Sequence, residues 1–183
     1  VNLPNSSNHH EASRIGTYME IRTVAVIGAG TMGAGIAQIC AQSGWKTNLF
    51  DAFSDGLERG MSNIDSFWDK GIARGKTTKQ QKQEWAANLF PISELSDAVK
   101  DADMVIEAVP EIMDLKCEIF QNLGSLTKKE CILGTNTSSL SISQIAEASG
   151  KPDKVIGMHF FNPVPIMKLL ELIKHDKCSK ETI

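Results

Sequence analysis

Residues 23–33, TVAVIGAGTMG, decide the fold of this chain. Thr23 to Ile27 is a run of β-branched and apolar residues, which is typical of a buried parallel strand. The turn Gly28-Ala29-Gly30-Thr31-Met32-Gly33 follows with G-x-G-x-x-G spacing, which lets the backbone turn tightly, approach a diphosphate and pack closely. A helix over Ala34 to Ser43 and a strand over Lys46 to Phe50 then complete one strand–helix–strand unit of about 30 residues.

An acidic residue follows this unit at the place where a dinucleotide-binding fold needs one. Asp51 directly follows the second predicted strand, 23 positions after Gly28. Its carboxylate would accept hydrogen bonds from the adenosine ribose and repel a 2′-phosphate, and no arginine follows it immediately. We therefore predict NAD rather than NADP, with the pyrophosphate at the helix N-terminus; the alternative is a purely structural glycine turn beside a surface aspartate. The predicted contacts of this motif are Gly28, Gly30, Thr31, Met32, Gly33 and Asp51.

The rest of the chain continues the alternation of helices and strands. Expected helices cover 54–73, 79–85, 111–126 and 141–148, and expected strands cover 88–92, 103–107, 131–134, 155–159 and 168–173. This order predicts an α/β fold with a doubly wound, mostly parallel Rossmann sheet and helices on both faces. Residues 1–20 show no such periodicity, so we expect a flexible N-terminal extension before a single domain over 21–183.

The composition is that of an ordinary soluble globular protein. Apolar residues make up 42% and charged residues 22%, and the net charge of -3 gives no indication of nucleic acid or an anionic membrane as a partner. The four cysteines are scattered and His9-His10 are adjacent, so neither a metal site nor a disulfide framework is expected. No apolar run approaches the roughly 18 residues of a membrane helix, and no signal peptide is recognisable, so we predict a cytoplasmic protein.

Three polar stretches lie at or near the ends of predicted strands, namely 135–140 (TNTSSL), 157–163 (GMHFFNP) and 167–172 (MKLLEL). Open α/β sheets place their ligand crevice at the carboxyl ends of the strands. His159 is suited to moving a proton near neutral pH, although a histidine chosen from sequence alone is more often structural. Glu171 stands inside an apolar run, where it either pairs with a histidine or lies on a solvated face.

Four segments resemble the N-terminal half of the 3-hydroxyacyl-CoA dehydrogenases. They are VAVIGAGTMGAGIAQICAQSGW (24–45), DMVIEAVPEIMDLKCEIFQNL (103–123), NTSSLSISQIA (136–146) and GMHFFNPVPIMKLLELI (157–173). The resemblance covers residues 21–183, and the short-chain 3-hydroxybutyryl-CoA enzymes look especially similar. It implies a reversible reaction in which (3S)-hydroxyacyl-CoA and NAD give 3-ketoacyl-CoA and NADH.

The resemblance also implies roles for individual residues. His159 is the implied proton carrier, Glu171 its partner, and Ser138 the contact to the 3-oxygen of the substrate. The positions implied near the nicotinamide and its ribose are Glu111, Lys116, Asn136 and Asn162, and the residues implied near the phosphates of coenzyme A are Arg74 and Lys76. Glu111 can equally be explained as a solvated helix start, and the two basic residues as a solvated loop.

The sequence departs from this family in one respect. The family continues into an all-helical domain that forms the dimer, closes over the acyl-CoA and carries a catalytic asparagine in an Asn-Arg pair, and no such pair occurs here. We therefore expect modest NAD binding, slow or no turnover, and exposed apolar surface. Two other functions stay open, a β-hydroxyacid dehydrogenase with a catalytic lysine and a non-catalytic, crystallin-like relative.

Overall fold

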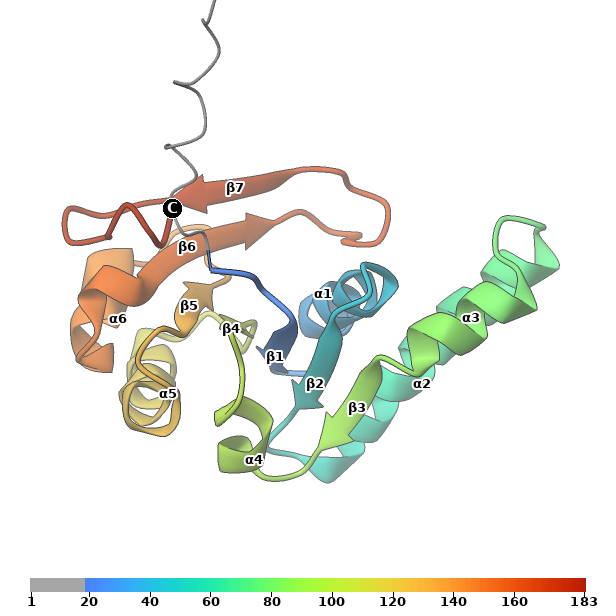
Figure 1. Cartoon of the computed structure of the whole chain (residues 1–183), viewed down its shortest axis with the longest axis horizontal. Coiled ribbons are helices and arrows are strands. Elements are labelled where there is room, and N and C mark those ends of the chain that lie inside the picture. The colour runs from blue at the N-terminus through green and yellow to red at the C-terminus, as the bar shows by residue number, and fades with distance from the viewer. Residues whose placement is uncertain (1–18) are drawn as a thin grey trace, which may run out of the picture.

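The computed structural model describes residues 19–183, and the expectations for residues 1–18, His9-His10 included, lie outside this range. A seven-stranded sheet forms the centre, in the order β3-β2-β1-β4-β5-β6-β7 (Figure 1). The neighbours from β3 to β6 are parallel, and β7 pairs antiparallel with β6. The strands are β1 (Thr23–Ile27), β2 (Lys46–Phe50), β3 (Leu89–Ile92), β4 (Met104–Glu107), β5 (Ile132–Thr135), β6 (Val155–Phe160) and β7 (Leu170–Ile173).

Helices cover both faces of the sheet, as the doubly wound fold predicted (Figure 1). Alternate residues of a strand point to opposite faces, so Val24 and Val26 of β1 enter one core cluster and Ala25 and Ile27 enter the other. The first cluster contains residues of α1 and α2, and the second contains residues of α4, α5 and α6. The helices are α1 (Thr31–Gln42), α2 (Ser54–Ala73), α3 (Lys79–Ala86), α4 (Leu95–Val99), α5 (Met113–Leu126) and α6 (Ile142–Ser149), with a 3₁₀ turn η1 (Pro152–Lys154).

The strand order reverses between β1 and β4, and this reversal creates the crevice in which such sheets bind ligands. The chain runs outward from β1 through β2 to β3 and then returns to β4 on the other side of β1. Ile27, the last residue of β1, is paired with Glu107, the last residue of β4. The glycine turn after β1 and the segment after β4 therefore lie next to each other at the carboxyl ends of the parallel strands.

Several bounds differ from the expected ones for local reasons. α1 begins at Thr31 because Gly30 takes the N-cap position, three residues earlier than the apolar pattern indicates. The short α4 and η1 were not predicted, since five and three residues are too few to show a helical period. Pro91 fits a strand because β3 is an edge strand, whose free side needs no N–H donor.

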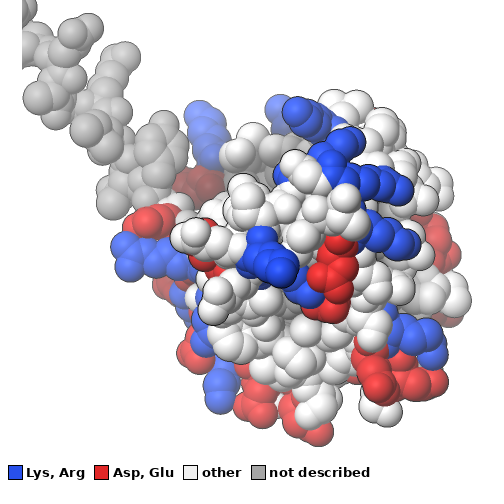
Figure 2. Space-filling view, turned by 90° about the vertical axis from the view of Figure 1, so that its right-hand side faces the viewer, with Lys and Arg blue, Asp and Glu red and all other residues white. Residues whose placement is uncertain are grey.

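All four cysteines are free, and two of them are buried, Cys40 and Cys131. Burial raises the pKa of the Cys40 thiol to about 12, which keeps it in the unreactive thiol form. Within residues 19–183 no helix has both the length and the apolar character needed to cross a bilayer. On the face that Figure 2 shows, basic and acidic side chains are interspersed with uncharged surface.

Candidate active site

The glycine turn has the geometry that its motif predicts. Gly28 has φ +99°, and its backbone N–H donates to the Phe50 carbonyl at 2.8 Å, so the turn is tied to β2. A Cβ on Gly33 would lie 1.7 Å from the Gly28 oxygen, so a side chain there would clash with the turn. A Cβ on Gly30 would meet nothing within 4 Å. The first and third glycines are therefore required by the fold, while the second leaves space above the helix N-terminus for a ligand.

Asp51 lies beside this turn with part of its hydrogen-bonding capacity still free. Its Oδ2 accepts from the Ala29 N–H at 2.8 Å and its Oδ1 from the Phe53 N–H at 2.9 Å. A carboxylate has about four acceptor sites, so each oxygen retains one for a ribose hydroxyl. Asp51 lines a pocket of about 340 Å³ together with Gly30, Thr31 and Arg59. The pocket offers a place for the adenosine ribose beside the diphosphate position, so the residues present fit a dinucleotide.

The other predicted contacts of the motif lie in different surroundings. Thr31 borders the pocket of Asp51 and also a second pocket of about 240 Å³ that Asn162 lines. The segment after β6 and the first turn of α1 therefore face the same space. The side chain of Met32 packs against the core cluster of α1, which leaves its backbone as the group available to a ligand.

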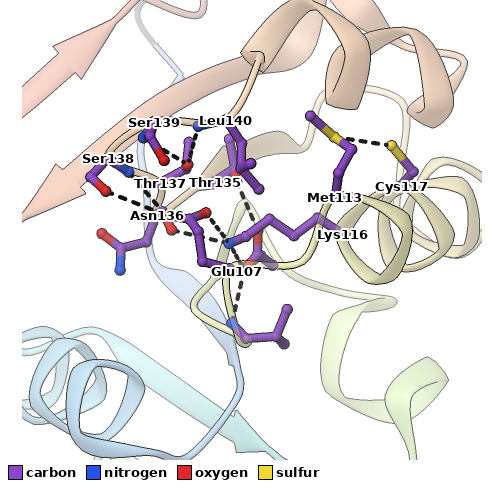
Figure 3. Close-up of polar contacts among 12 residues, drawn as sticks. Glu107, Met113, Lys116, Cys117, Thr135, Asn136, Thr137, Ser138, Ser139 and Leu140 are labelled. Carbon is purple, nitrogen blue, oxygen red and sulfur yellow. Dashed lines mark hydrogen bonds and ion pairs between the residues drawn. The ribbon is translucent and has the colours of Figure 1, made fainter.

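A buried ion pair between Lys116 and Glu107 lies beside the loop that follows β5 (Figure 3). The ammonium of Lys116 is 2.6 Å from Oε2 of Glu107, and both side chains are 0% exposed. Lys116 also donates to the Asn136 carbonyl at 3.1 Å. The resemblance implies a position for Lys116 near the nicotinamide ribose, whereas in the structure its charged group is directed into the protein. Burial raises the pKa of the Glu107 carboxyl, against the opposing effects of the Lys116 charge and of hydrogen bonds from Lys116, Thr135 and Val109.

Glu111 and Ser138 meet above this pair. The Glu111 Oε2 accepts from the Ser138 backbone N–H at 3.2 Å and lies 3.5 Å from the Ser138 hydroxyl. Partial burial works to raise the pKa of Glu111, but hydrogen bonds from Thr137 and Ser138 and the charge of Lys116 outweigh it, so this pKa is lowered. Glu111 is therefore an ionised acceptor that contacts the predicted substrate residue and is not merely a solvated helix start.

Asn136 connects the loop after β5 to β6. Its side-chain Oδ1 accepts from the Phe160 backbone N–H at 3.1 Å, directly after His159 in the sequence. β5 and β6 are adjacent parallel strands, so their ends emerge together. The loop that carries Asn136 and Ser138 is thereby held next to the predicted proton carrier.

His159 and Glu171 face each other across β6 and β7, where they are directly paired in the strand register. The Nδ1 of His159 is 3.6 Å from Oε1 of Glu171, and their side chains are 25% and 52% exposed. The His159 ring also packs against Phe161, with ring centroids 4.5 Å apart. Both readings of Glu171 therefore hold in part, because it is half exposed and still lies beside the histidine. The antiparallel direction of β7 produces this contact.

Arg74 and Lys76 are not brought to this group. Both are exposed residues at the turn between α2 and α3, where Gly75 has φ +71°. This turn forms the far end of a helical hairpin that projects from the sheet (Figure 1). Sequence reasoning also missed Glu107. The available signal was an acid ending the apolar run of β4, since a buried carboxylate needs a partner.

A dinucleotide is the ligand that fits the glycine turn and Asp51 at the carboxyl ends of the parallel strands. Fold and site together define a dinucleotide-binding domain of the dehydrogenase class. The family model described as "3-hydroxyacyl-CoA dehydrogenase, NAD binding domain" matches residues 23–183. The chain belongs to this family, and the prediction of NAD as cofactor is confirmed.

Individual relatives agree with this assignment. The 3-hydroxybutyryl-CoA dehydrogenase of Clostridioides difficile is 43% identical over 159 residues, which are 87% of this chain and 56% of that protein. The 3-hydroxyadipyl-CoA dehydrogenase of Escherichia coli is 39% identical over 85% of this chain and 32% of that protein. The crystal structure of (S)-3-hydroxybutyryl-CoA dehydrogenase from Ralstonia eutropha matches with a TM-score of 0.86 at 39% identity, over 89% of this chain and 57% of that chain. The chain thus spans only part of the length of each relative.

Proposed function

We propose that the chain is the cofactor-binding part of an enzyme that interconverts (3S)-hydroxyacyl-CoA and 3-ketoacyl-CoA. The observation that carries this proposal is the facing pair of His159 and Glu171. His159 lies near the carboxyl end of β6, and the glycine turn follows the carboxyl end of β1, so both belong to the same end of the parallel strands. A polarisable acid–base pair and a dinucleotide site at one edge are what oxidation of an alcohol requires.

The proposed chemistry assigns a proton to His159. Bound NAD supplies the acceptor for the hydride that leaves C3 of the substrate. The ring nitrogen of His159 remote from Glu171 takes the hydroxyl proton as the C3–O bond becomes a carbonyl, and in the reverse direction it returns that proton. Glu171 orients the ring and stabilises the imidazolium. Ser138 donates a hydrogen bond to the same substrate oxygen.

The remaining predicted residues complete the proposal around this centre. Glu111, Asn136 and Asn162 border the nicotinamide side, and Lys116 supports it from beneath the loop. Arg74 and Lys76, on the projecting hairpin, are proposed to meet the phosphates of coenzyme A. Both residues are exposed, as contact with a ligand requires.

For the whole enzyme we propose a cytoplasmic homodimer that acts in fatty acid β-oxidation or butanoate metabolism. The names of the relatives support this context, since they include a fatty acid oxidation complex subunit alpha from Idiomarina loihiensis as well as 3-hydroxybutyryl-CoA dehydrogenases. The side chains of His159 and Glu171 are 25% and 52% exposed, so water reaches both in this chain and we expect slow turnover here.

Two measurements test the proposal. Fluorescence titration with NADH is expected to show saturable binding, and NADPH should bind much more weakly. Oxidation of NADH is then followed with the protein in excess over acetoacetyl-CoA, with free acetoacetate as the control substrate. A faster reaction with the free acid would favour a β-hydroxyacid dehydrogenase. NADH binding without oxidation of NADH by either substrate would favour the non-catalytic alternative.

A further inference from the structure

Glu107 is a buried carboxylate for which the proposed reaction has no direct use. It ends β4 at the point where the strand order reverses, paired with Ile27 just before the glycine turn. Its side chain is 0% exposed and accepts three hydrogen bonds, from Lys116 Nζ at 2.6 Å, Thr135 Oγ1 at 2.7 Å and the Val109 N–H at 2.8 Å. These donors come from three separate segments, so the carboxylate joins them into one unit (Figure 3).

Lys116 lies between two carboxylates at unequal distances. Its ammonium is 2.6 Å from Glu107 and 3.7 Å from Oε1 of Glu111, and only the first distance is that of a hydrogen bond. Its other hydrogen bond goes to the Asn136 carbonyl. Glu111 in turn is engaged with Ser138. The position of the ammonium therefore affects Asn136 through a direct hydrogen bond and Ser138 through Glu111.

We propose that Glu107 is a positioning residue for the nicotinamide side of the site. Its charge holds the Lys116 ammonium beneath residues 136–138, and so leaves Glu111 free to contact Ser138 and the ligand. The inference rests on the proposed function for the identity of that ligand.

Electrostatics gives the reason for this assignment. A buried ammonium without a counter-charge is costly, so Lys116 must pair with whichever carboxylate is available. Without the charge of Glu107, the nearest carboxylate is Glu111. A shift of Lys116 toward Glu111 would weaken its bond to the Asn136 carbonyl. It would also draw Oε1 of Glu111 toward the ammonium and so disturb the carboxylate whose other oxygen, Oε2, accepts from Ser138. Within residues 19–183 no hydrogen bond or ion pair joins the glycine turn or Asp51 to these side chains, so the adenosine half of the site would be unaffected.

The test separates the two halves of the cofactor. Glu107→Gln keeps the shape of the side chain and removes its charge, and the dissociation constants for NADH and ADP are measured at pH 7. We expect NADH to bind about tenfold more weakly, the size of one charge-assisted hydrogen bond, while ADP binds as before. The matched control is Asp103→Asn just before β4, because Asp103 also accepts three hydrogen bonds, from the Arg22 and Thr23 N–H groups and from Lys128. It lies at the opposite end of the strand, so it should leave both constants unchanged.

Thermal unfolding of each variant accompanies the titrations. If Glu107→Gln does not fold, Thr135→Val is used instead, since it removes only the 2.7 Å hydrogen bond to Glu107. This variant should weaken NADH binding by about twofold to threefold and leave ADP binding unchanged. Equal losses for NADH and ADP, or no loss for either in a folded variant, would overturn the inference. Failure of the unaltered chain to bind NADH would instead contradict the proposed function.

Discussion

The imidazole of His159 and the carboxylate of Glu171 lie opposite each other on antiparallel strands, with Nδ1 3.6 Å from Oε1. Only 12 positions separate them in the sequence, yet the reversal of the chain after β6 is needed to bring them together. Both side chains keep contact with solvent. A ring so placed has one nitrogen facing the carboxylate and one facing away from it, as transfer of a proton to and from a substrate demands.

The first prediction concerns this pair. His159→Asn should lower the single-turnover rate of acetoacetyl-CoA reduction by NADH by at least about a hundredfold, because the proton donor is lost. Glu171→Gln should cost less, about tenfold, because solvent screens its half-exposed charge. NADH affinity should stay within about twofold in both variants. Glu147→Gln, at an exposed position of α6 where Glu147 pairs with Lys177, is the control and should react like the unaltered chain. Equal rates for all variants would remove the pair from the reaction.

The second prediction concerns the choice of cofactor. Asp51→Asn removes the charge that would repel a 2′-phosphate and weakens the acceptors for the ribose. NADH should bind about tenfold more weakly, whereas the affinity for NADPH should fall by less or rise. The preference for NADH over NADPH should therefore decrease. Fluorescence titrations with both nucleotides measure this ratio. Asp97→Asn on α4, which removes an exposed charge of a surface ion pair, is the control. An unchanged ratio in Asp51→Asn would show that another group selects the cofactor.

The third prediction separates two glycines of the same turn. Gly33→Ala should destabilise the chain by about 3 kcal/mol or more, because the new Cβ would lie 1.7 Å from the Gly28 oxygen. Gly30→Ala should stay within about 1 kcal/mol of the unaltered chain, since its Cβ meets nothing within 4 Å. Gly30→Ala should nevertheless weaken NADH binding by about tenfold, because the added methyl group would hold the diphosphate away from the backbone. Urea unfolding and NADH titration measure the two effects, and a Gly30→Ala variant with full affinity would contradict the placement of the diphosphate.

The fourth prediction is a pH dependence of stability. Burial works to raise the pKa of Asp103, but hydrogen bonds from Lys128, Thr23 and Arg22 outweigh it and lower this pKa below the ordinary value of 3.8. A lowered carboxyl pKa stabilises the folded state above the unfolded value and loses that effect as the pH falls through the folded value. Asp103→Asn should therefore cost about 1–2 kcal/mol at pH 7 and less at pH 3, where the stabilisation has begun to be lost. Urea unfolding at both pH values measures the difference, and a cost independent of pH would show that the charge of Asp103 contributes nothing.

Much of the fold was predictable because its signals are local. The bounds of β1, β2 and α2 agree with the sequence-based ranges, since a buried strand, a strand ending in an acid and a long amphipathic helix each carry their own period. α4 and η1 were missed because elements of three to five residues are too short for a period. The direction of β7 also could not be read from the sequence, because a single apolar run is compatible with either sense of pairing.

The site divides in the same way. The glycines and Asp51 were predictable, since their chemistry depends on spacing within one strand–helix–strand unit. The resemblance to a known family supplied His159, Glu171 and Ser138, and the structure places the first two in contact. Neither route found Glu107, because its partners Lys116 and Thr135 belong to other elements. The burial of the Lys116 ammonium was missed for the same reason.

By itself the sequence determined the doubly wound fold, the diphosphate turn and the preference for NAD. These follow from backbone conformations and spacings that neighbouring residues impose on one another. Only the tertiary structure decided which carboxylate pairs with Lys116, which acid faces His159, and where the loop of Ser138 is held. The physical reason is that a buried or half-buried charge is stabilised by whichever groups the folded chain places around it, and that placement depends on strand order and register across the whole sheet.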